Sequence, residues 1–134
     1  MLRVVADTNI YVSALNFGGM PERLLRLAED EAVRLVASDA ILGEVAKVLM
    51  DEKFAWSEER ITQTLRELRG ITERVEPTET LAVITADPSD NRILECADAG
   101  RADFIVSGDK HLLALKHYRQ TPILKVADFL RQLP

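Results

Sequence analysis

Two short apolar segments, far apart in the sequence, each lead into an acidic side chain. Residues 3–6 run into Asp7, and residues 104–108 lead to Asp109. Neither segment alternates apolar with polar residues, which is typical of strands covered on both faces in a parallel sheet. In open sheets of this kind, the carboxyl ends of the strands border a crevice in which ligands bind. We therefore expect Asp7 and Asp109 to lie near each other at that edge, where two carboxylates favour a shared cation.

The remaining chain alternates between predicted strands and predicted helices. Apolar runs predict further strands at residues 33–37, 71–75 and 122–125. Helical spacing of apolar residues predicts helices at residues 10–15, 21–28, 39–49, 57–70, 90–99, 110–115 and 127–133. Ser38 or Asp39 is expected to cap the third helix, and Gly70 and Gly100 to end the fourth and fifth. This alternation predicts a three-layer α/β/α sandwich with a mainly parallel sheet.

The length and composition suit one globular domain that spans residues 1–134. With 47% hydrophobic residues, the chain can bury a substantial core. Its apolar runs are too short to cross a bilayer, and its first residues lack a secretory signal pattern, so we expect a cytoplasmic protein. The single cysteine, Cys96, allows neither an internal disulfide nor a zinc cluster, and we expect a buried free thiol.

The net charge of the chain bears on its partners. A charge of −5 argues weakly against nucleic acid, because lysine and arginine dominate phosphate binding. Two bound divalent ions would bring this charge close to zero. The acidic balance therefore does not exclude a phosphate-containing substrate.

Two further acids occupy informative positions. Asp90 follows Asp87 at a predicted helix start, and Glu44 lies on a predicted helix beside Ile41 and Val45. Carboxylates that converge without histidine or cysteine suit Mg²⁺ or Mn²⁺. Such ions polarise phosphoryl oxygens and activate water, which is the chemistry of phosphodiester hydrolysis.

Each of these acids also has a structural explanation. Asp7 and Asp109 could simply cap the helices that follow them, and capping is the preferred explanation for Asp90 taken alone. Glu44 could occupy a solvent-facing rim, and Asp87 is best explained as a turn residue before Pro88, with an additional outer acid of the site as the alternative. The four acids together favour a metal site more strongly than any one of them does.

The order of four motifs resembles the PIN-domain nucleases. These motifs are Asp7-Thr8-Asn9 after the first strand, Glu44 on the helix after the second, residues 87–91 (DPSDN) and residues 102–110 (ADFIVSGDK). The resemblance covers nearly the whole chain and is greatest to the VapC-like toxin components of prokaryotic toxin–antitoxin pairs. It implies a Mg²⁺- or Mn²⁺-dependent endoribonuclease with a catalytic and metal-binding quartet of Asp7, Glu44, Asp90 and Asp109.

The resemblance also implies supporting residues around this quartet. Thr8, Asn9 and Ser107 are expected to orient the carboxylates, and Ser13 would lie one helical turn beyond Asn9. Turn formation and helix capping explain Thr8, Asn9 and Ser107 almost as well, and outside the resemblance Ser13 is an ordinary helix serine.

Contacts with RNA have few candidates. Arg92, Lys110 and His111 adjoin the predicted ligands in sequence, although ordinary surface charge explains them slightly better. The aromatic residues that could stack on bases are Tyr11, Phe17, Phe54 and Trp56. With aromatic residues at only 5% of the chain, we expect these four to pack in the core or at an interface.

The resemblance further implies two protein partners. One is a cognate antitoxin that covers the acidic cleft with basic side chains, and the other is a second copy of the chain in a homodimer. Two functions from other classes were weighed. A phosphoacceptor receiver domain needs an aspartate at the end of the third strand, where Val75 and Glu76 stand, and a metal-dependent phosphatase needs an aspartate at Asn9.

Overall fold

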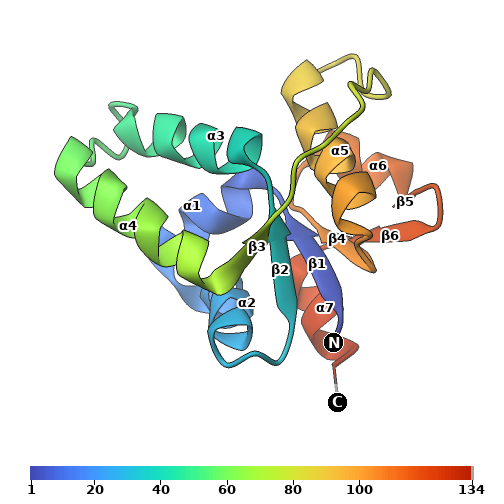
Figure 1. Cartoon of the computed structure of the whole chain (residues 1–134), viewed down its shortest axis with the longest axis horizontal. Coiled ribbons are helices and arrows are strands. Elements are labelled where there is room, and N and C mark those ends of the chain that lie inside the picture. Colours follow the sequence, from blue (N-terminus) through green and yellow to red (C-terminus); the bar gives the residue numbers. More distant parts are fainter. Residues whose placement is uncertain (134) are drawn as a thin grey trace.

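The computed structural model describes residues 1–133 and contains one six-stranded sheet (Figure 1). The strand order is β3-β2-β1-β4-β6-β5, and every pairing is parallel except that of β5 with β6. The strands are β1 (Arg3–Ala6), β2 (Arg34–Ala37), β3 (Thr72–Arg74), β4 (Phe104–Val106), β5 (His117–Tyr118) and β6 (Thr121–Leu124). The helices are α1 (Thr8–Phe17), α2 (Gly19–Glu29), α3 (Asp39–Met50), α4 (Glu58–Ile71), α5 (Asn91–Gly100), α6 (Lys110–Leu115) and α7 (Val126–Arg131), and a short 3₁₀ helix spans Pro88–Asp90.

Helices flank this sheet, as the sequence predicts. The helix α5 packs on β1, β2 and β4, whereas α2 packs on β2 and contacts α7. The helices α3 and α4 form a pair beside α1, at the β3 side of the sheet (Figure 1). The predicted three-layer α/β architecture with a mainly parallel sheet is confirmed. Within residues 1–133, no helix is both long and apolar enough to cross a membrane.

The central strand β1 is the part of the core that carries the site. Val4, Val5 and Ala6 are fully buried, and β1 pairs with β2 on one side and β4 on the other. Only Asp7 separates β1 from α1, so the backbone passes from strand to helix at a single residue. This short connection holds Asp7 rigidly at the carboxyl edge of the sheet.

Several helix boundaries differ from the predictions. The helix α1 is longer than residues 10–15 because the Asp7 side chain caps it at Thr8. Gly70 lies inside α4 instead of ending it. Gly100 is the last residue of α5, and the left-handed residue Arg101 provides the C-cap. A Cβ atom on Gly100 would lie 2.4 Å from Val36 Cγ1, so this glycine is explained by the close approach of α5 to β2.

The sequence did not predict the hairpin of β5 and β6. It joins His117 and Tyr118 to residues 121–122 at the edge of the sheet. Tyr118 donates a hydrogen bond to Asp98 Oδ2 at 3.1 Å, and Arg119 forms an ion pair with the same carboxylate. Asp98 of α5 therefore holds this hairpin through two side chains. Cys96, by contrast, is a buried free thiol as predicted.

Candidate active site

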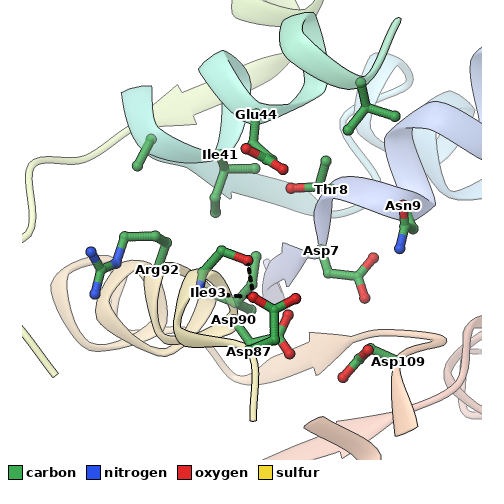
Figure 2. Close-up of a pocket in the computed structure, with 13 residues that line it drawn as sticks. Asp7, Thr8, Asn9, Ile41, Glu44, Asp87, Asp90, Arg92, Ile93 and Asp109 are labelled. Carbon is green, nitrogen blue, oxygen red and sulfur yellow. Dashed lines mark hydrogen bonds between the residues drawn. The ribbon is translucent and has the colours of Figure 1, made fainter. Parts of the chain in front are cut away.

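The carboxyl ends of β1 and β4 open into a cleft whose other walls are formed by α3 and by the segment that leads into α5 (Figure 2). We call it the acidic cleft. The carboxylates that line it are Asp7, Glu44, Asp87, Asp90 and Asp109. The fold thus brings all four acids of the predicted quartet to one cleft, and adds Asp87.

Asp7 combines a capping role with a place in the cleft. Its Oδ1 accepts a hydrogen bond from the backbone N–H of Ile10 at 3.0 Å, and its Oδ2 accepts one from the Ser107 hydroxyl. The side chain is 4% exposed, and this burial raises the pKa of Asp7 above its ordinary value, against the opposing effect of these hydrogen bonds. Asp7 therefore caps α1 and lines the acidic cleft at the same time.

Asp109 has a similar double role at the start of α6. Its Oδ2 accepts hydrogen bonds from the backbone N–H groups of His111 at 2.9 Å and Leu112 at 3.1 Å. Its own N–H donates to Ser107 Oγ at 2.9 Å. The buried Ser107 hydroxyl therefore links Asp7 to Asp109 and fixes both strand ends relative to each other.

Asp90 does not cap the helix that it precedes. The side chain of Asp87 instead caps the 3₁₀ helix Pro88–Asp90, because its Oδ1 accepts hydrogen bonds from the Ser89 N–H at 3.1 Å and the Ser89 hydroxyl at 2.6 Å (Figure 2). The capping explanation was therefore wrong for Asp90, and the turn explanation was right for Asp87. The Oδ2 atom of Asp90 is buried without a hydrogen-bond partner. Burial, and then the charges of Asp109 and Asp87, raise the pKa of Asp90 from 3.8 to about 7.

Glu44 reaches the cleft from the opposite wall. Ser38 caps α3 by accepting a hydrogen bond from the Ile41 N–H at 3.3 Å, which sets the phase of the helix. Ile41 and Val48 then line the cleft beside Glu44, whose side chain is partly buried. Figure 2 shows its carboxylate directed toward the side where Thr8 and Asp7 lie.

The donor set of the cleft fits a hard divalent cation. Five carboxylates with no histidine or cysteine offer oxygen ligands alone, which suits Mg²⁺ or Mn²⁺ better than zinc. The Oδ2 atom of Asp90 has no partner, and burial together with the charges of Asp109 and Asp87 raises its pKa, so no cationic side chain among the described residues neutralises this carboxylate. Within residues 1–133, no three His, Cys, Asp or Glu side chains stand close enough together to hold an ion as they are.

The predicted supporting residues fall into two groups. Thr8 and Asn9 line the acidic cleft, and Ser107 lies beneath it. Ser13 lines a neighbouring groove between α1 and α3, which we call the α1–α3 groove. Its residues are Asn9, Val12, Ser13, Phe17, Glu44, Lys47, Val48, Asp51, Lys53 and Phe54.

The three predicted RNA contacts are also separated by the fold. Arg92 lines the cleft, but its guanidinium pairs with Glu95 at 2.9 Å and points away from the carboxylates (Figure 2). Lys110 and His111 directly follow Asp109 and do not line the cleft.

The sequence reasoning missed the residues that hold the irregular segment against α5. Asn91 accepts a hydrogen bond from the Ile84 N–H at 2.8 Å and donates to the carbonyls of Ile84 and Pro88 at 2.8 and 3.0 Å. Glu95 accepts one from the Leu81 N–H at 2.8 Å. The available signal was Asn91 itself, a polar residue directly after Asp90 on a helix whose neighbouring side chains are buried.

Comparisons with known proteins agree with this geometry. A family model described as the PIN domain matches residues 3–111. Among solved structures, the chain is similar to one described as VapBC2 from Rickettsia felis bound to a DNA fragment from its promoter. The TM-score is 0.62 at 16% sequence identity, and the match covers 91% of this chain and 97% of that one. No curated protein sequence matches the chain significantly. The extent of the family match, over a fold with the same architecture, shows that the chain belongs to the PIN-domain family.

Proposed function

We propose that this chain, as one nuclease domain, is a metal-dependent endoribonuclease that hydrolyses phosphodiester bonds in RNA. PIN domains are in general nucleases and generally use divalent metal ions. The observation that carries the proposal is the convergence of Asp7, Glu44, Asp90 and Asp109 on one cleft, with a buried Asp90 oxygen that has no partner.

The acids of the cleft would hold the metal ion and orient the reacting groups. Asp7 and Asp109 are fixed by helix caps and by Ser107, so they present their carboxylates in constant positions. Asp90 and Glu44 face them from the 3₁₀ helix before α5 and from α3, and complete an oxygen-lined site for Mg²⁺ or Mn²⁺. When bound, such an ion polarises the scissile phosphate and lowers the pKa of water. The carboxylates orient the attacking water and the phosphate, which favours an in-line geometry.

We further propose that the chain is the toxin of a toxin–antitoxin pair. The similar structure from Rickettsia felis is described as a VapBC2 complex with promoter DNA, which supports a protein partner for this fold. An antitoxin that inserts basic side chains would complement the carboxylates of the cleft and block substrate. A homodimer is proposed on the family resemblance alone.

Cleavage of a mixed RNA pool tests the activity. The purified protein is incubated with Mg²⁺ or Mn²⁺, with chelator, and as the Asp7→Asn variant. We expect metal-dependent cutting that chelator abolishes and that Asp7→Asn reduces by at least about a hundredfold, because the variant loses a charged ligand. A folded Asp7→Asn protein that cuts as fast as the wild type would refute the assignment of the cleft. A single-stranded DNA pool run in parallel tests the preference for RNA.

A further inference from the structure

The α1–α3 groove extends away from the acidic cleft and is continuous with it. Asn9, Glu44 and Val48 line both. From Asn9 to Phe17 the groove follows α1 for about 12 Å, at 1.5 Å per residue. Anything that leaves the acidic cleft along this side of α1 therefore passes the far end of the groove.

An exposed aromatic pair lies at that far end. Phe17 is 74% exposed at the last position of α1, so it contributes little to the core. Its ring meets Phe54 edge to face, with centroids 6.2 Å apart and an interplanar angle of 61°. Gly18, with φ of +71°, ends α1 and turns the chain into α2 directly after Phe17. Of the two places expected for Phe17, the core is therefore excluded, and a position at an interface stays a prediction.

The α1–α3 groove contains two lysines beside two acids, Glu44 and Asp51, whereas the acidic cleft has one cation among five acids. Lys47 and Lys53 both line the groove, and Lys53 Nζ lies 5.4 Å from the centroid of the Phe54 ring. In the part of the chain that the structure describes, neither lysine forms an ion pair with an acid. In the acidic cleft the one lining cation, Arg92, is already paired with Glu95. A phosphate displaced from the carboxylates would first meet available ammonium groups in the α1–α3 groove.

We propose that the α1–α3 groove is a subsite for single-stranded nucleic acid. An unpaired base stacks on the exposed ring of Phe17, which Phe54 supports edge to face, and Lys47 and Lys53 contact the flanking phosphates. Stacking on aromatic side chains beside a cationic groove is the usual way in which proteins hold single strands, and it requires bases that are not paired in a duplex. This subsite rests on the proposed nuclease function, since it would place the next phosphates of the strand over the carboxylates.

A protein partner that covers Phe17 is the competing explanation for the exposed pair. Two observations favour nucleic acid: the unpaired lysines match phosphates in charge, and the groove leads into the acidic cleft. The two explanations differ in what a leucine at position 17 does. Leucine keeps apolar contact area for a protein partner but has no aromatic face for a base.

Binding of a defined oligonucleotide tests the subsite. The probe is a single-stranded RNA of about ten nucleotides that contains 2-aminopurine, whose fluorescence is quenched by stacking. It is titrated with the full chain in Ca²⁺, and its integrity is checked on a denaturing gel. We expect Phe17→Ala and Phe17→Leu each to weaken binding roughly tenfold and to remove the quenching, and Phe17→Trp to retain both. Lys53→Gln should weaken binding and lower the slope of log affinity against log salt by about 0.7.

The controls separate this proposal from folding and from the nuclease function. Lys116→Gln removes an exposed lysine beside β5, at the opposite edge of the sheet, and should leave binding unchanged. Thermal midpoints of the Phe17 variants should match the wild type because the ring is exposed. Binding that depends on Phe17 in a protein that cuts no RNA would support the subsite and refute the nuclease function.

Equal binding by wild type and Phe17→Ala would overturn the subsite even if the wild type cuts RNA. Absence of any binding by the wild type would do the same. A change in oligomeric state on Phe17→Ala, with unaltered oligonucleotide binding, would assign the aromatic pair to a protein contact instead.

Discussion

At the residue scale, Asp90 and Ser107 show how differently neighbouring polar groups can be satisfied. The Ser107 hydroxyl is fully used, because it donates to Asp7 and accepts from the Asp109 N–H. Asp90 keeps a buried oxygen without any partner. A carboxylate left in this state is costly to the folded protein when it is charged. Binding of a proton or a cation to Asp90 should therefore change the free energy of unfolding more than binding to any other acid of the cleft.

The pH dependence of stability follows from the pKa of Asp90. That pKa rises from 3.8 to about 7 on folding, so between these values the folded chain holds a proton that the unfolded chain has lost. The stabilisation of the folded chain that the protonated Asp90 provides is present below about pH 4 and is lost as pH rises toward 7. In chelator, we expect the free energy of unfolding of the wild type to fall over this range, as measured in urea. Asp90→Asn, which mimics the neutral acid, should fall less.

The matched control for this measurement is Asp30→Asn. Asp30 is exposed at the end of α2, away from the acidic cleft, and should not alter the pH profile. Parallel profiles for wild type and Asp90→Asn would contradict the raised pKa.

At the element scale, the position of α5 depends on one close contact with the sheet. Gly100 approaches Val36 of β2 so closely that a Cβ atom would lie 2.4 Å from Val36 Cγ1. The same helix carries Asn91 and Glu95, which hold residues 81–88 in place. Asp87 lies in that segment and Asp90 lies just beyond it. The position of α5 on the sheet therefore determines where these two acids lie.

A substitution at Gly100 should therefore destabilise the fold. We expect Gly100→Ala to lower the free energy of unfolding by about 1–3 kcal/mol, because buried overpacking forces the helix or Val36 to shift. Gly43→Ala in α3 is the matched control, since nothing lies within 4 Å of the added Cβ atom. That change should stabilise the protein by roughly 0.5–1 kcal/mol through helix propensity. Denaturant unfolding measures both, and equal effects of the two alanines would contradict the close contact.

At the scale of the whole molecule, the acidic cleft joins elements that are distant in sequence. Asp7 ends β1, Glu44 lies on α3, Asp90 precedes α5 and Asp109 follows β4. A cation bound by all of them would bridge much of the fold. It would bind the folded chain and not the unfolded one, so it would stabilise the protein by mass action.

Addition of Mn²⁺ should raise the thermal midpoint of the metal-free protein. At a concentration one hundred times the dissociation constant, the gain is about 2.7 kcal/mol. Ser107→Ala, which frees both Asp7 and Asp109 from their shared hydrogen bonds, should weaken Mn²⁺ binding by roughly tenfold in calorimetric titration. Ser57→Ala removes a helix cap of α4 outside the cleft, so it should cost about 1 kcal/mol of stability and leave Mn²⁺ affinity unchanged. A midpoint that does not respond to Mn²⁺ or Mg²⁺ would count against a metal site.

The sequence by itself determined the features that depend on neighbours along the chain. Apolar runs predicted β1 and β4, the capping residue Ser38 predicted the start of α3, and α6 has the predicted bounds of residues 110–115. These signals are local because helix capping and the periodicity of apolar residues act over a few residues. The order of the four acids then indicated the PIN-domain family, which the family match confirms.

Only the tertiary structure decided which partner each polar or aromatic side chain has. Taken alone, Asp90 was best explained as the cap of α5, yet its side chain caps nothing, Asp87 caps the 3₁₀ helix before it, and the Oδ2 atom of Asp90 is buried without a partner. Arg92 was a candidate for phosphate and pairs with Glu95, and Phe17, expected in the core or at an interface, is not in the core. The contacts of Arg92 with Glu95 and of Asp87 with Ser89 are local, because their partners lie two or three residues apart. The acidic cleft and the burial of one Asp90 oxygen depend instead on elements that are distant in the chain, and no local pattern of the sequence encodes the distances between them.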